Sequence, residues 1–86
     1  MQVVHKYPIV LGDYPLVKMP TEAKILHFGL DANEILCIWA EVNPENTFTA
    51  KEFQIVGTGH AVDESAKRYI GTVIHHTYVW HLYELQ

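Results

Sequence analysis

Two glycine–threonine steps carry the residues in this chain whose types and spacing best suit the binding of an anion. The first is Gly57–His60, which reads Gly-Thr-Gly-His, and the second is Gly71-Thr72. Glycines tolerate positive φ and let backbone N–H groups converge on a negative charge, while a threonine hydroxyl and His60 supply further donors. The alternative is that these glycines only form a bulge or a turn where a strand leaves its sheet.

The basic pair Lys67-Arg68 follows the first step and would supply charge partners for a phosphate held there. A solvated polar loop is the other interpretation of this pair. If the strands that carry the two steps are paired, their glycines would form a flat floor free of side chains, on which a base or a ribose could lie. Close packing of the strands without any ligand explains the second glycine equally well.

Aromatic side chains near the two steps offer a stacking surface for a base, although core or interface anchoring is their commoner role in small β proteins. We expect the core role for Trp39. Trp80 and Tyr83 stay open, because strand alternation places them on opposite faces. The candidate ligand-binding residues are Gly57, Thr58, Gly59, His60, Arg68, Gly71, Thr72 and Trp80.

The other reactive residue types lack the spacing that catalysis or metal binding requires. The chain has six histidines, but none are two residues apart, and the adjacent His75 and His76 would point to opposite faces of a strand. We therefore expect no metal site and no cofactor. Cys37 lies in an apolar run and is expected to be a buried, inert thiol. Because no Ser-His-Asp or Cys-His spacing stands out, no catalytic residue is assigned and an enzyme is not expected.

Composition favours one small domain, residues 1–86, with a surplus of apolar surface. Hydrophobic residues make up 49% of the chain, more than a small interior can hide, so we expect a homo-oligomer. The formal net charge of −4 and the scattered basic residues argue against binding to a nucleic-acid duplex. No signal peptide is evident and no apolar run approaches the ~18–20 residues of a membrane helix, so a cytoplasmic protein without membrane association is expected.

Strand-like patterns run through nearly the whole chain and predict a mainly β fold. The clearest unit is a hairpin of 24–30 and 35–42 around a polar turn. Leu26, Phe28 and Leu30 would share one face of its first strand. The second strand is apolar on both faces and is therefore predicted to be central or covered.

A second hairpin is predicted around 75–77, whereas 63–68 could form a single helical turn or an exposed loop. Six or seven short strands with closely spaced turns predict a small antiparallel barrel or sandwich, or an α+β fold if the helical turn forms.

The order of several motifs resembles a family of short phage and prophage proteins of unknown function. These motifs span nearly the whole chain and are Lys6–Ile9, Met19-Pro20, Ala23–His27, Leu36–Ala40, Phe53–His60, Tyr69–Val73 and Val79–Glu84. The resemblance implies a compact, non-enzymatic protein that neutralises a defence system in the host cytoplasm. We expect a sponge that sequesters a nucleotide-derived immune signal; the alternative is an inhibitor that binds a host defence protein and no small molecule.

Overall fold

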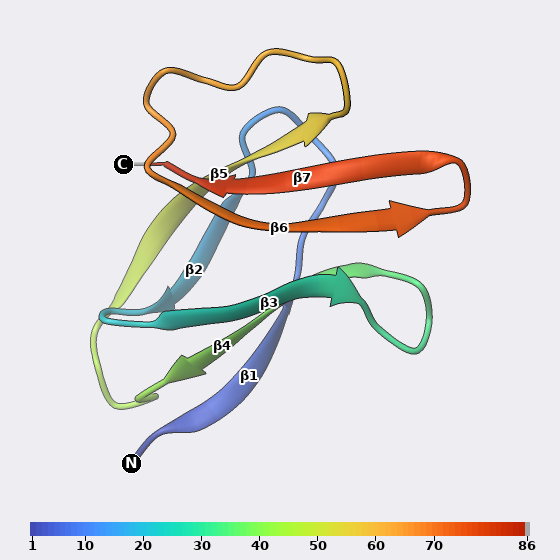
Figure 1. Ribbon diagram of the computed structural model, residues 1–86. Helices are drawn as coiled ribbons and strands as arrows, with labels where there is room; N and C mark the ends of the chain where they lie inside the picture. The colour runs from blue at the N-terminus through green and yellow to red at the C-terminus, as the bar shows by residue number, and fades with distance from the viewer. Residues whose placement is uncertain (86) are drawn as a thin grey trace.

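The computed structural model describes residues 1–85 and consists of antiparallel strands and their connections (Figure 1). The described residues contain no helix, so the predicted mainly β class is confirmed. Residues 63–67 form a turn at the end of a longer loop, and Arg68 begins a strand. The strands are β1 (Val3–Pro8), β2 (Leu16–Pro20), β3 (Lys24–Leu30), β4 (Leu36–Val42), β5 (Phe48–Gly57), β6 (Arg68–His75) and β7 (Tyr78–Glu84).

The first sheet has the order β1-β4-β3, and it confirms both the predicted hairpin and the central place of its second strand. The turn between β3 and β4 is organised by Asp31, whose carboxylate accepts hydrogen bonds from the backbone N–H groups of Asn33 at 2.8 Å and Ile35 at 3.0 Å. Strand β4 is covered on both faces, so neighbours that point in opposite directions, such as Cys37 and Ile38, are both fully buried. Cys37 is therefore the buried thiol that the sequence predicted.

One part of the predicted strand alternation in β3 is wrong. The register against β4 shifts between Ile25 and His27, which places a bulge in the middle of the strand. As a result Ile25 and Phe28 are both buried, while Leu26, predicted to share a face with Phe28, is 46% exposed. A bulge inserts one residue on one strand, and every side chain before it then changes face relative to those after it.

The second sheet has the order β2-β5-β7-β6. The long strand β5 makes this possible, because residues 48–52 pair with β2 and residues 53–57 pair with β7. Strands β6 and β7 form the predicted second hairpin, in which His75 pairs with Tyr78. The loop between β5 and β6 is fastened to β5 by Gln54, whose side chain accepts the Asp63 backbone N–H at 2.9 Å.

Side chains from both sheets form one core, which includes Met19, Phe28, Ile38, Phe53 and Leu82. Strand β3 of the first sheet lies beside β6 of the second (Figure 1). The two sheets are not joined into a closed barrel, and the arrangement is compatible with a small β-sandwich.

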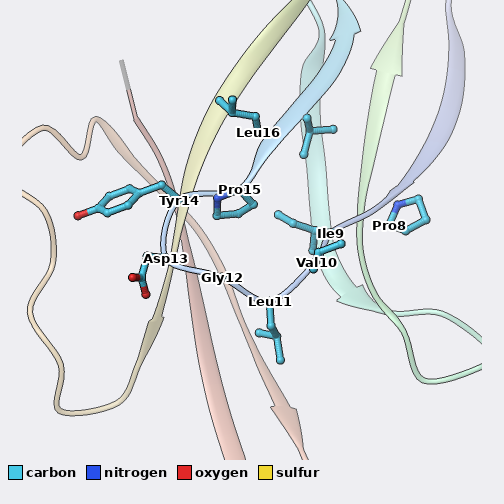
Figure 2. A pocket seen from close by; sticks show the side chains of 10 residues that line it. Pro8, Ile9, Val10, Leu11, Gly12, Asp13, Tyr14, Pro15 and Leu16 are labelled. Atoms are coloured by element: carbon cyan, nitrogen blue, oxygen red, sulfur yellow. The ribbon is translucent and has the colours of Figure 1, made fainter.

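Several large apolar side chains remain on the surface. The loop between β1 and β2 carries Val10 and Leu11, which are 80% and 52% exposed. Figure 2 shows this loop, whose residues line a hollow, with Ile9 and Pro15 on its two arms. Residues 1–85 contain no helix that could cross a membrane.

Candidate functional site

Four of the six basic side chains of this acidic protein surround a single open hollow of about 510 Å³. The hollow is lined by Ala23, Lys24, Lys51, Lys67, Arg68 and Glu84. The four cations and one carboxylate give it a formal charge of +3, whereas the whole chain carries −4. The hollow is therefore the place where the described part of the chain can best hold an anion.

Strand pairing explains why these distant residues meet. Glu84 at the end of β7 pairs with Phe53 of β5 on one side and with Arg68 of β6 on the other. Lys51 lies two residues before Phe53 and therefore shares its face of β5, which is also the face of the paired Glu84. Lys24 opens β3, the strand of the first sheet that lies beside β6. The Lys67 backbone N–H donates to the Glu84 carbonyl oxygen at 2.8 Å and holds the loop end against β7.

Glu84 forms ion pairs with two of the four cations. Its two carboxylate oxygens lie 2.7 Å from Lys51 Nζ and 3.3 Å from an Arg68 guanidinium nitrogen, respectively. Among residues 1–85, no carboxylate oxygen lies within 4.0 Å of the side-chain nitrogen of Lys24 or Lys67. These two lysines are thus available to a ligand, while Arg68 and Lys51 are held in place by Glu84.

A smaller hollow of about 250 Å³ adjoins the first and shares Lys51, Lys67 and Glu84 with it. It is also lined by Glu22 and Glu52, whose carboxylates offset the lysine charges. A negatively charged ligand is therefore expected in the larger hollow. We refer to that hollow, lined by Lys24, Lys51, Lys67, Arg68 and Glu84, as the cationic hollow.

The Gly57–His60 segment is a turn in which two of the four backbone N–H groups are already hydrogen-bonded within the protein. The His60 N–H donates to the Gly57 carbonyl oxygen at 3.0 Å, and the Thr58 N–H donates to the Val79 carbonyl oxygen at 3.3 Å. Gly59 has a backbone φ of 94°, which residues other than glycine rarely adopt. This turn explains Gly59, and it already engages the N–H groups of Thr58 and His60, which are therefore not directed at an anion.

The two glycine–threonine steps do meet, but through their threonines and a residue outside the predicted set. His81 of β7 lies between them, with Nε2 2.8 Å from Thr58 Oγ1 and Nδ1 2.9 Å from Thr72 Oγ1. The Tyr69 hydroxyl is hydrogen-bonded to Thr72 in turn. Because a neutral imidazole has one donor and one acceptor, one of the two hydroxyls must donate and the other must accept.

Strand register places His81 in this network. Strand β7 lies between β5 and β6, and His81 pairs with Val56 of β5 on one side and with Thr72 of β6 on the other. The C-terminal end of β5 and the middle of β6 therefore both lie next to His81. The sequence shows that the chain has a histidine at 81, but it does not show the register that aligns this histidine with both steps.

The other predicted residues divide between two further places. Gly71 lies next to a register shift between β6 and β7, and an added Cβ there would lie 3.6 Å from Phe28 Cβ, an ordinary contact distance, so packing does not require a glycine at this position. Trp80 stacks on Tyr78 with ring centres 5.7 Å apart and an interplanar angle of 14°. Together with Gly57, Thr58 and His60 these rings line a separate hollow of about 330 Å³.

The predicted ligand-binding residues are thus not assembled into one site. Arg68 pairs with Glu84, whereas Trp80 lies four residues earlier in β7, about 13 Å away at the rise of a β-strand. The fully buried Leu82 lies between Trp80 and Glu84 on the same face. The cationic hollow and the aromatic one are therefore two separate places on the protein.

A comparison of this chain with curated proteins and with solved structures gave no significant match. A family model described as a domain of unknown function, DUF7352, matches residues 1–86. Because the match extends over all 86 residues, the chain belongs to the DUF7352 family.

Proposed function

We propose that this protein is a non-enzymatic binding module that holds a small phosphate-bearing ligand in the cationic hollow. The observation that carries the proposal is the gathering of four of the six basic side chains around one hollow in a chain of net charge −4. Lysine and arginine make charge-assisted hydrogen bonds to phosphate oxygens, which are stronger than neutral ones.

Size and charge favour a nucleotide-derived ligand over a single phosphate or a nucleic-acid duplex. The volume of about 510 Å³ lies within the ~300–1,000 Å³ of small-molecule sites. A duplex needs a basic surface that follows its backbone, and Lys6 and Lys18 are the only basic residues outside the hollow. Sequestration of a nucleotide immune signal, as implied by the resemblance to phage proteins, is the specific form of the function that we propose.

The lining of the cationic hollow favours binding over chemistry. Within the described part of the chain, it includes no side-chain hydroxyl, thiol or imidazole group. Its one carboxylate, Glu84, is engaged by Lys51 and Arg68 and is not free to take a proton from a substrate. The site offers positive charge and hydrogen-bond donors, which hold an anion without transforming it.

A thermal-shift panel of cyclic dinucleotides, ADP-ribose derivatives and inorganic phosphate tests the proposal. A ligand present at 100 times its Kd adds about 2.7 kcal/mol to the free energy of unfolding, which raises the melting temperature by roughly 10–20 °C in a domain of this size. Lys24→Gln and Lys67→Gln are expected to weaken binding by roughly 10- to 100-fold, the range of a charge-assisted hydrogen bond.

Lys18→Gln is the matched control, because Lys18 is exposed on β2 and lies outside the lining of the hollow. If no compound shifts the melting temperature, or if Lys18→Gln weakens binding as much as Lys67→Gln, the cationic hollow is not the ligand site.

The exposed apolar side chains favour a second candidate, a protein-binding inhibitor that also self-associates. Val10, Leu11 and Leu16 are all exposed in or next to the loop of Figure 2. Large exposed apolar groups on a small domain are typical of an interaction surface. A native mass measurement would show whether the chain forms a homo-oligomer. Stable capture of one host protein, with no compound shifting the melting temperature, would support the inhibitor.

A further inference from the structure

We propose a metal site that joins the two sheets at Glu34, His75 and His76. One potential ligand atom from each of these residues lies within 4.8 Å of the other two. Glu34 belongs to the turn between β3 and β4, and the two histidines belong to the β6–β7 hairpin end. Both turns lie at the same side of the molecule (Figure 1). The site is separate from the cationic hollow and does not depend on the proposed function.

The distances fit a tetrahedral transition-metal ion. The Nε2 atoms of His75 and His76 lie 3.4 and 3.7 Å from Glu34 Oε1. Zinc binds imidazole nitrogen and carboxylate oxygen at about 2.0–2.2 Å, which puts two ligands at a tetrahedral angle roughly 3.3–3.5 Å apart. The two distances to Glu34 therefore match or nearly match tetrahedral coordination, and the three residues each offer a ligand atom within 4.8 Å of the other two.

Backbone conformation explains why two adjacent histidines can act together. His76 has a φ of 58°, in the left-handed region, so it does not continue the alternation of β6. The rings of His75 and His76 consequently lie on the same side, with centres 4.4 Å apart. The expectation that they point to opposite faces is wrong at this turn. Glu34 has a φ of 61° and is also held in the left-handed region.

The ligand set and its exposure indicate which metal would bind. Two imidazoles and one carboxylate suit zinc, nickel or copper better than magnesium or calcium, which prefer oxygen ligands alone. The side chains of His76 and Glu34 are 72% and 65% exposed, so the ion would be accessible and would keep water in a fourth position. Such an ion would bind the hairpin end of one sheet to that of the other.

Titration of the full chain with Zn²⁺ by calorimetry, with Mg²⁺ in parallel, tests this site. We expect one Zn²⁺ per chain, no Mg²⁺ binding, and a melting temperature raised by roughly 5–10 °C at ten times the zinc Kd. Co²⁺ in place of zinc should give the visible absorption of a tetrahedral ion. Sedimentation with and without zinc should show an unchanged mass, because all three ligands come from one chain.

Glu34→Gln and His76→Asn should each lower zinc affinity at least tenfold. Asparagine tolerates positive φ, so the second variant retains the turn. His5→Ala removes an exposed histidine elsewhere and should bind zinc like the native chain. The proposal is overturned if zinc does not bind, if His5→Ala weakens binding as much as His76→Asn, or if zinc only binds by linking two chains.

Discussion

Replacing Glu84 by glutamine should destabilise the fold and tighten anion binding at the same time. Glu84 is bonded to Lys51 at 2.7 Å and to Arg68 at 3.3 Å, with only 18% of its own side chain exposed. Partly exposed ion pairs contribute about 0.5–1 kcal/mol each, so the loss of both should cost about 1–2 kcal/mol. For a domain of this size, such a loss lowers the melting temperature by about 4–16 °C.

The effect on the ligand has the opposite sign, because the change removes the only negative charge that residues 1–85 place in the lining of the cationic hollow. At a separation of about 6 Å, two unit charges interact with about 0.7 kcal/mol in bulk water and about 2.8 kcal/mol at an effective dielectric constant of 20. The hollow is open to solvent, so the lower part of this range applies. We expect affinity for a phosphate-bearing ligand to rise by about 3- to 10-fold.

The assay pairs thermal melting of the free protein with calorimetric titration of the best compound from the ligand panel, both in low salt. Asp13→Asn is the control, since it removes one negative charge from an exposed loop residue that does not line the hollow. It should change neither quantity appreciably. If Glu84→Gln lowers the melting temperature but leaves anion affinity unchanged or reduces it, Glu84 is only a structural ion-pair partner and the anion binds elsewhere.

Three further predictions concern the stability of the fold. The Ile35 backbone N–H and the Lys6 ammonium hold the pKa of Asp31 at about 2, below its ordinary 3.8; this stabilisation is present above pH 4 and lost as the pH falls toward 2. The melting temperatures of the native chain and Asp31→Asn should therefore differ at pH 6 and converge near pH 2, and a constant difference would contradict this. Tyr7→Phe removes a buried hydroxyl that has no hydrogen-bond partner within residues 1–85, so it should change stability by about 0 to +1 kcal/mol; a clear loss in urea unfolding would reveal a bond to that hydroxyl. Gly59→Ala forces a side chain into a φ of 94° and should cost about 1 kcal/mol or more in the same assay, whereas an unchanged midpoint would show that the turn adapts.

Much of the fold could be predicted from the sequence, because its strongest signals are local. The polar turn between two apolar runs predicted the β3–β4 hairpin, and apolar residues on both faces predicted that β4 is central. The bulge between Ile25 and His27 could not be predicted, since it arises from pairing with β4 and leaves no glycine or proline as a local signal. Its consequence is the exposure of Leu26 where strict alternation buries it.

The candidate sites were harder to predict because each depends on which residues of separate strands are aligned. Lys67 and Arg68 were identified as cations for an anion, but Lys24 and Lys51 join them only because Glu84 of β7 pairs with both β5 and β6.

The proposed metal site depends on the backbone conformation of single residues, which the pattern of residue types does not reveal. His75 and His76 diverge on an extended strand, and only the positive φ of His76 brings their rings together. Glu34, more than forty positions earlier in the chain, completes the cluster because the hairpin ends of two sheets meet there. Ligand spacing in a sequence is therefore informative only when the backbone between the ligands is regular. A His-His pair that closes a two-residue β-turn should be considered as a potential ligand pair even though strand alternation argues against it.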